Sequence, residues 1–266
     1  MPRRVIFISG AGISVESGIR AFRVDTDSGQ AMWDEYSLDE VCEIQAFERG
    51  YWNYQGESDP AGYDKDGVDL YTKTHQFYDK RRQELETVEP NLAHMRIAEW
   101  AFHYPGQVLN ITTNVDDLFE RAGIDRSDIV HVHGYLPEVK TDRSGTLLDV
   151  GYSPSNFEQY DYCKPNVVFF GEVSGYYKDM YNILDTLTAQ DMVVVVGCSN
   201  QVINFNWEIF PAMNWGVKMA VVNPRINYLE EQEYAQRGVV VYRAGAVETF
   251  SNINFISMIE RHLNGA

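Results

Sequence analysis

The feature that most constrains the fold is a series of short apolar runs, rich in valine and isoleucine, with helical patterns between them. Strands buried on both faces of a parallel sheet have this composition, because helices cover both faces. The runs are Val5–Ile8, Val108–Ile111, Val167–Phe170, Met192–Val196, Met219–Val222 and Val239–Tyr242. The helical patterns lie near 92–103, 115–122, 178–189, 204–213 and 251–263. This alternation predicts a doubly wound α/β fold with a mostly parallel sheet.

Two regions interrupt the alternation. Residues 25–90 contain tryptophans, many tyrosines and a Gly/Asp-rich stretch at 56–69, and residues 135–165 are polar and rich in turn residues. We expect both to project from the sheet and to form a smaller domain together. The Rossmann-like domain would then consist of residues 1–24, 91–134 and 166–266. Asn91 follows a proline and is expected to cap the helix at 92–103.

Near the N-terminus, the run Val5–Ile8 stops at Gly10-Ala11-Gly12, and a helix-compatible segment follows. This order places backbone N–H groups at a helix N-terminus, where the dipole favours phosphate. We expect Gly10 to let the chain turn and Gly12 to let a pyrophosphate approach without a Cβ in the way. The pattern is shorter than the full dinucleotide fingerprint, so the turn alone leaves open whether a nucleotide binds.

Composition excludes several functions. The formal net charge of −17 opposes binding to nucleic acid and favours basic partners, although acidity can also serve solubility alone. We expect no signal peptide and no membrane span, since no apolar run approaches the required length. The cysteines, Cys42, Cys163 and Cys198, are far apart and form no CxxC pair. They predict neither a disulfide framework nor a metal site, and a reducing cytoplasm fits them best.

Further motifs follow the N-terminal GAGISVESGIRAFR in a fixed order. They are TTNVDDLFERAG (112–123), HVHGYL (131–136), VVFFGE (167–172), VVGCSNQVINFN (195–206) and VVNPR (221–225). This order resembles the sirtuins, the NAD-dependent protein deacylases. The resemblance implies removal of an acyl group from lysine, with release of nicotinamide and O-acyl-ADP-ribose.

The resemblance also assigns residues to roles. The NAD-binding positions it implies are Gly10, Ala11, Gly12, Ser14, Phe22, Arg23, Asn114, Asp116, Gly197, Ser199, Asn223, Gly245 and Ala246. The catalytic residues it implies are His133 and Asn114. The loop implied to line the acyl-lysine tunnel and to pair with the substrate backbone contains Val168, Phe170, Gly171 and Glu172.

The residue types suit this chemistry. A histidine titrates near neutral pH, so His133 can act as the base that activates a ribose hydroxyl. Asp116 can accept a hydrogen bond from the nicotinamide carboxamide, and Asn114 can hold a ribose hydroxyl or a water without adding charge. Asn and Asp also commonly cap helices, which is the structural alternative for Asn114 and Asp116. We interpret His131 as structural.

A second signature concerns the acyl group. Tyr78 and Arg81 match the Tyr-x-x-Arg signature of the class III sirtuins, which remove succinyl, malonyl and glutaryl groups. On a helix, residues three apart share a face, so both tips can reach one pocket. A guanidinium binds a carboxylate bidentately and the phenol adds a hydrogen bond. The alternative is an ordinary solvated helix face.

The chain also departs from the family. The zinc-ribbon cysteines are missing, because the interval between His133 and the VVFFGE motif holds only Cys163, so we expect packing alone to hold the smaller domain. Thr113 replaces the usual glutamine, and Asp25 and Asp27 replace small residues of the cofactor loop. If Asp25 and Asp27 face the acyl pocket, they would oppose an acyl carboxylate. The missing zinc ribbon and Thr113 leave open an NAD glycohydrolase on the same fold, and an ADP-ribosyltransferase or a non-catalytic NAD-binding module are further alternatives.

Overall fold

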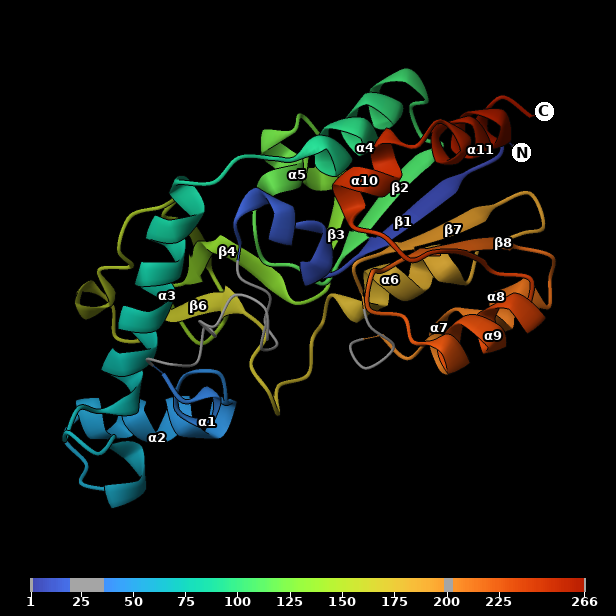
Figure 1. Cartoon of the computed structure of the whole chain (residues 1–266). Coiled ribbons are helices and arrows are strands. Elements are labelled where there is room, and N and C mark those ends of the chain that lie inside the picture. Colours follow the sequence, from blue (N-terminus) through green and yellow to red (C-terminus); the bar gives the residue numbers. More distant parts are fainter. Residues whose placement is uncertain (1, 20–35, 199–202, 266) are drawn as a thin grey trace.

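The computed structural model describes residues 2–19, 36–198 and 203–265 (Figure 1). In these ranges a six-stranded sheet has the order β3-β2-β1-β7-β8-β9, and every neighbouring pair is parallel. Its strands are β1 (Val5–Ser9), β2 (Val108–Thr112), β3 (Ile129–His131), β7 (Met192–Val196), β8 (Lys218–Val222) and β9 (Val240–Tyr242). The predicted α/β class with a mostly parallel sheet is therefore confirmed.

Helices cover both faces of the sheet (Figure 1). In β1, Val5 and Phe7 pack into one hydrophobic core while Ile6 and Ile8 pack into the other, which explains the absence of polar alternation. One face carries α4 (Leu92–His103), α5 (Leu118–Arg121), α10 (Ala246–Ser251) and α11 (Ile253–Leu263). The other carries α6 (Tyr177–Leu184), α7 (Phe205–Glu208), α8 (Phe210–Met213) and α9 (Tyr228–Gln236).

The helix at 92–103 begins as expected. The Asn91 side chain accepts a hydrogen bond from the backbone N–H of Ala93 at 2.9 Å, and the His94 side chain accepts one from the Asn91 N–H at 3.3 Å. These bonds satisfy N–H groups that a helix start leaves without partners. The pattern at 204–213 instead divides into the short helices α7 and α8.

One apolar run does not join the main sheet. The run Val167–Phe170 begins at the end of β6 (Lys164–Val167), in an antiparallel sheet of order β5-β4-β6 with β4 (Gly134–Lys140) and β5 (Leu147–Asp149). The expectation that this run forms a strand of the parallel sheet is therefore wrong. The run is apolar because it meets the aromatic core of α1 (Leu38–Val41), α2 (Ile44–Tyr54) and α3 (Leu70–Glu86). We call α1–α3 with β4–β6 the small module.

Aromatic side chains fill the centre of the small module. Phe47 packs against Phe169 and Tyr71 at centroid distances of 5.4 and 5.1 Å, and His75 stacks on Phe157 at 4.3 Å. No group of His, Cys, Asp and Glu side chains suited to a metal ion occurs among the residues described. Packing is thus one of the forces that hold this part of the chain together.

Buried hydrogen bonds supplement this packing, so the expectation of packing alone was incomplete. The fully buried Arg82 guanidinium pairs with Asp79 and donates to the backbone oxygens of Leu136 and Ser153, both at 3.2 Å. The His75 ring contacts Ser155 Oγ at 3.0 Å. These bonds join α3 to β4 and to the segment before β6.

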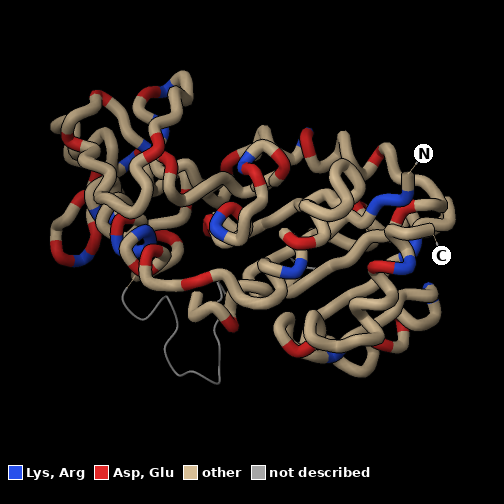
Figure 2. Tube along the Cα trace, turned by 90° about the horizontal axis from the view of Figure 1, so that it is seen from above, with Lys and Arg blue, Asp and Glu red and all other residues tan. Residues whose placement is uncertain are grey.

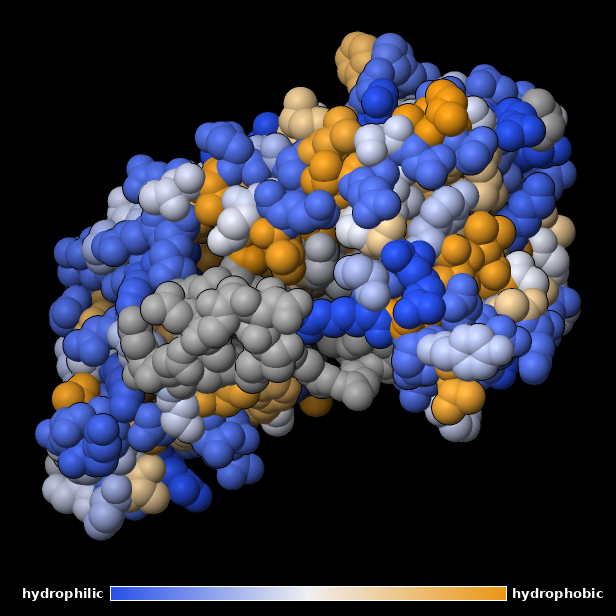
Figure 3. All heavy atoms as spheres, in the orientation of Figure 1, coloured by the Kyte–Doolittle hydropathy of each residue, from blue (hydrophilic) through white to orange (hydrophobic). Residues whose placement is uncertain are grey.

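Acidic residues occur along the chain in both the main sheet region and the small module (Figure 2). Within the described ranges, no helix is long and apolar enough to cross a membrane. On the face seen in Figure 3, apolar side chains occur in several separate groups among hydrophilic ones.

Candidate active site

The loops that follow β1, β2 and β7 meet at the carboxyl edge of the parallel sheet. Parallel strands end at a common edge, and this is where α/β proteins bind ligands. The loop after β1 contains Gly10 to Ser14, the loop after β2 contains Asn114 and Asp116, and Gly197 follows β7. Most of the predicted cofactor residues therefore come together at this edge.

The glycines in these loops serve a purpose that the sequence did not indicate. The Gly12 N–H donates to the Gly197 oxygen at 2.9 Å, and a Cβ on Gly12 would lie 2.6 Å from the Gly197 Cα. A Cβ on Gly10 would lie 2.8 Å from the Cys198 Cα. Gly10 itself has an extended backbone with φ of −128°, so it is not needed for a left-handed turn. Because they have no side chain, the glycines let the backbones of the loops after β1 and β7 pack directly against each other; we call this contact the interlock.

The expected helix after the glycine turn is also different in the structure. Within residues 10–19 the chain forms two single-turn 3-10 helices, Ala11–Ile13 and Val15–Ser17. Gly18 ends the second turn with a φ of +97°. The described part of this loop therefore offers short turns, rather than the N-terminus of a long helix dipole, to a phosphate.

We expect Gly12→Ala to lower the free energy of unfolding by about 1–3 kcal/mol, the usual cost of overpacking. The new methyl group would have to displace the backbone of Gly197. Urea denaturation measures the effect. Gly175→Ala is the matched control, since a Cβ there meets nothing within 4 Å. Equal stability of the two variants would contradict the interlock.

Three buried polar side chains form the centre of the site. Ser14 Oγ donates to Asp116 Oδ2 at 2.9 Å and accepts from Asn114 Nδ2 at 3.0 Å. All three residues are less than a tenth exposed. Burial raises the pKa of Asp116 to about 6 despite the Ser14 hydrogen bond. Asp116 Oδ1 also accepts from the N–H of Leu118, the first residue of α5, at 3.3 Å, although the N-cap residue of that helix is Asp117.

His133 lies beside the same loop. Its Nδ1 is 3.1 Å from the backbone oxygen of Thr113, and its Nε2 is 3.0 Å from the hydroxyl of Tyr177. A carbonyl only accepts, so Nδ1 carries the proton and Nε2 presents its lone pair. Burial lowers the pKa of His133, which favours the neutral ring. The imidazole is therefore held in the tautomer that a base at Nε2 requires.

His131 and Thr113 support this arrangement. His131 Nδ1 is 3.0 Å from the Asn114 oxygen, and its Nε2 is 3.0 Å from Glu120 Oε1, so its interpretation as structural fits its contacts. The Thr113 side chain donates to the Ser9 oxygen at 3.2 Å, while its backbone oxygen holds His133. Any residue at position 113 could supply that oxygen, which is why sequence reasoning about the lost glutamine did not find it.

The residues predicted to lie near the adenosine of NAD follow β8 and stand at the start of α10, after β9. The Asn223 N–H donates to the Tyr242 oxygen at 3.0 Å. Gly245 caps α10, and the Glu16 carboxylate accepts from the Val247 N–H at 2.8 Å in the first turn of that helix. Ala246 is buried in the core. The predicted residues Phe22, Arg23 and Ser199 lie outside the described residues, as do Asp25 and Asp27, the two departures from the family pattern.

The loop after β6 is joined to both neighbours. The Val168 N–H donates to the His133 oxygen at 2.8 Å. The Phe170 N–H donates to the Cys42 oxygen at 2.8 Å, and the Phe170 oxygen accepts from Ile44 at 3.1 Å. These backbone groups of Phe170 thus bind within the chain, although its side chain is half exposed. Gly171, at φ of +79°, makes the following turn.

Glu172, which the resemblance places in the substrate loop, has partners in the chain. Its carboxylate accepts from the Phe169 N–H at 2.8 Å and lies 3.0 Å from the Lys164 ammonium. Lys164 is buried, and burial lowers its pKa to about 8. These contacts make Glu172 an anchor of the loop.

Tyr78 and Arg81 are buried, so the alternative of a solvated helix face does not hold for them. The Tyr78 ring stacks on Phe169 at a centroid distance of 5.6 Å, and its hydroxyl is 3.6 Å from Cys42 Sγ. The Arg81 guanidinium lies 2.9 Å from Glu84 Oε1. Tyr78 is thus directly beside the loop that continues to Phe170.

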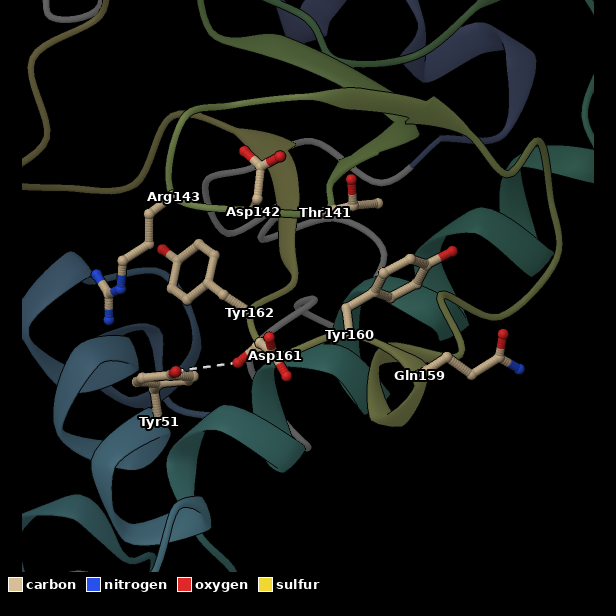
Figure 4. Close-up of a pocket in the computed structure, with 8 residues that line it drawn as sticks. All are labelled: Tyr51, Thr141, Asp142, Arg143, Gln159, Tyr160, Asp161 and Tyr162. Carbon is tan, nitrogen blue, oxygen red and sulfur yellow. Dashed lines mark hydrogen bonds between the residues drawn. The ribbon is translucent and has the colours of Figure 1, made fainter.

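A surface hollow of about 450 Å³ lies elsewhere, in the small module. In Figure 4, Tyr51 and Asp161 join across it through a hydrogen bond of 2.9 Å to the Asp161 oxygen. The Arg143 guanidinium lies 4.4 Å from the Tyr162 ring centroid and pairs with Glu48 at 2.9 Å. None of the predicted site residues lines this hollow, so we place the active site at the sheet edge.

Comparison with known proteins identifies the family. The model of the Sir2 family matches residues 10–204. The chain belongs to the Sir2 family. This confirms the resemblance to the sirtuins that the ordered motifs indicated.

Among Sir2 relatives, an NAD-dependent protein deacylase of Helicobacter hepaticus is 34% identical over 226 residues, covering 77% of this chain and 78% of the relative. One of Campylobacter jejuni is 32% identical over 206 residues and covers 76% of each. A solved Sir2 homologue mutant in complex with ADP-ribose superimposes with a TM-score of 0.73 at 24% identity, over 99% of this chain and 94% of that one. The structure of a Sir2 homologue in complex with NAD superimposes with a TM-score of 0.71 at 24% identity, over 98% of this chain and 91% of that one.

Tyr177 is the site residue that sequence reasoning missed. It stands at the start of an amphipathic helix, where tyrosine is an ordinary half-buried residue. No motif marks it, and its contact with His133 depends on how the loop before α6 folds back.

Proposed function

We propose that this Sir2 chain is an NAD-dependent protein deacylase whose base is His133. The observation that carries the proposal is an arrangement of side chains from three loops. His133 keeps its proton on Nδ1, at the Thr113 oxygen, and Ser14 Oγ bonds both Asp116 and Asn114, the residue after Thr113. The deacylase names of the relatives support it.

The residues present suit NAD. Neutral amide and hydroxyl groups, Asn114 and Ser14, would hold the sugar hydroxyls, and the buried Asp116 would accept from the carboxamide. When bound, NAD supplies an electrophilic ribose carbon as nicotinamide departs. His133 then takes a proton at Nε2 from a hydroxyl, and its Nδ1–H remains on the Thr113 oxygen, which stabilises the imidazolium. Asn114 orients the sugar without adding charge.

We also propose that Tyr78 and Arg81 select acyl groups that end in a carboxylate, such as succinyl and malonyl. The guanidinium already pairs with one carboxylate, that of Glu84, which is 42% exposed and can move away. The Tyr78 ring stacks on Phe169, the residue before Phe170, and this contact supports a role for Tyr78 near that loop. A charge-assisted hydrogen bond contributes about 1.5–3 kcal/mol.

The direct test combines the purified chain with NAD and peptides that carry acetyl-, succinyl- or glutaryl-lysine. We expect nicotinamide release that requires the peptide, together with acyl-ADP-ribose detected by mass spectrometry. Release of nicotinamide without peptide would instead establish the NAD glycohydrolase alternative. Loss of either activity in Asn114→Ala would assign it to this site.

We expect Arg81→Met to reduce kcat/KM for the succinyl peptide by about ten- to a hundredfold, because it removes the charged partner of the acyl carboxylate. The acetyl peptide is the internal control and should change less than threefold. Steady-state kinetics on both peptides measures the ratio. Equal losses on both would contradict acyl selection by Arg81.

A further inference from the structure

Tyr177 contacts the atom of His133 that the proposed reaction uses. Because Nδ1 holds its proton on the Thr113 oxygen, the Tyr177 hydroxyl is the donor and Nε2 the acceptor, at 3.0 Å. The two rings are inclined by 49° with centroids 5.9 Å apart, so the contact is through the hydroxyl and not through stacking. An imidazole Nε2 has one lone pair and accepts from one donor at a time.

The start of α6 is fixed in this position by its own contacts. Ser174 Oγ donates to the Val132 oxygen at 2.6 Å, one residue before His133. The Tyr176 hydroxyl donates to Asn166 Oδ1 at 3.2 Å. Behind Tyr177, the Tyr181 ring packs at a centroid distance of 6.1 Å. The segment at the start of α6 is thus bound to the residue before His133 and to β6, which directs Tyr177 at the imidazole.

We propose that Tyr177 is a positioning residue that holds Nε2 of His133 through its hydroxyl and gives way to the ribose hydroxyl when the dinucleotide binds. This inference rests on the proposed function and deepens it. The bond holds the neutral imidazole in the tautomer that a base requires. Its release then costs one neutral hydrogen bond during binding.

The surroundings of the pair suit such an exchange. The groups that act on His133 from β2 and α6 are the Thr113 oxygen and the Tyr177 hydroxyl. Burial raises the pKa of Tyr177, and the negative charge of Glu208 on α7 and Cys198 after β7 raise it further. The phenol therefore remains protonated, and remains a donor, throughout the neutral range.

The test compares Tyr177→Phe with the wild-type protein. The control is Tyr181→Phe on the same helix, because it keeps the ring and removes a hydroxyl that contacts Glu208 and not His133. A donor to Nε2 stabilises the neutral ring, so its removal should raise the pKa of His133. We expect a rise of about 0.7 in an NMR titration of the His133 ring, assigned by its loss in His133→Asn. Tyr181→Phe should leave this pKa unchanged. An unchanged pKa in Tyr177→Phe would overturn the positioning role.

Calorimetric titration with ADP-ribose tests the exchange. The Kd should fall about fivefold in Tyr177→Phe, because the ribose hydroxyl no longer displaces the phenol. A Kd that is unchanged or higher, with wild-type binding intact, would overturn the exchange while leaving the proposed function standing. If ADP-ribose binds neither protein, the proposed function fails, and the pKa of His133 still reports on the Tyr177 contact.

Discussion

Replacing His133 with alanine should lower kcat/KM for NAD-dependent deacylation by about 10²–10⁴-fold, the usual contribution of a positioned base. The variant loses the lone pair on Nε2, which is free of a proton because Nδ1 donates its own proton to the Thr113 oxygen. Peptide-dependent nicotinamide release measures the loss. His103→Ala is the control, because His103 is the exposed last residue of α4. A decrease below tenfold in His133→Ala would show that another group is the base.

The pH profile gives a second measure of the same role. Burial lowers the pKa of His133 below its usual value of about 6.5. The base is therefore deprotonated across the neutral range, and kcat/KM should fall below pH 6.5, through this lowered value and through the pKa of about 6 of Asp116. An acid limb with a midpoint above 6.5 would contradict the assignment.

The second large effect concerns stability. Arg82→Met should lower the free energy of unfolding by about 3–5 kcal/mol, because breaking a buried ion pair leaves the other charge uncompensated. In this chain Asp79 would lose its guanidinium, and the Leu136 and Ser153 oxygens would lose their donor. Urea denaturation followed by circular dichroism measures the change.

The control for this prediction is Arg96→Met. Arg96 pairs with Glu99 at 2.6 Å on the more exposed surface of α4, where an ion pair contributes at most about 1 kcal/mol. If both variants lose less than 1 kcal/mol, the hydrogen bonds of Arg82 do not hold the small module.

A chelator such as EDTA should leave the wild-type unfolding curve unchanged.

The fold was largely predictable because its strands are buried on both faces. Runs such as Val5–Ile8 and Met192–Val196 have no polar alternation, and the structure places both at the centre of the sheet. The run Val167–Phe170 misled the prediction, because aromatic packing demands the same composition as a central strand. Strand β3, with three residues, was too short to stand out from its surroundings.

The candidate site was predictable as a set of residues but not as a set of contacts. The motifs named Ser14, Asn114 and Asp116, which lie together in the structure, yet gave no sign that Ser14 bridges the other two. The contacts of Thr113 and Tyr177 with His133 depend on a backbone oxygen and on loop folding. Neither has a residue signature, so neither could be found from sequence alone.

The interlocked glycines limit how this chain can vary. Gly12 and Gly197 approach so closely that the loops after β1 and β7 form one mechanical unit, although 184 positions separate them in the sequence. A longer loop transplanted from a relative at either place would collide with its counterpart. Successful chimaeras should therefore exchange both segments from the same parent.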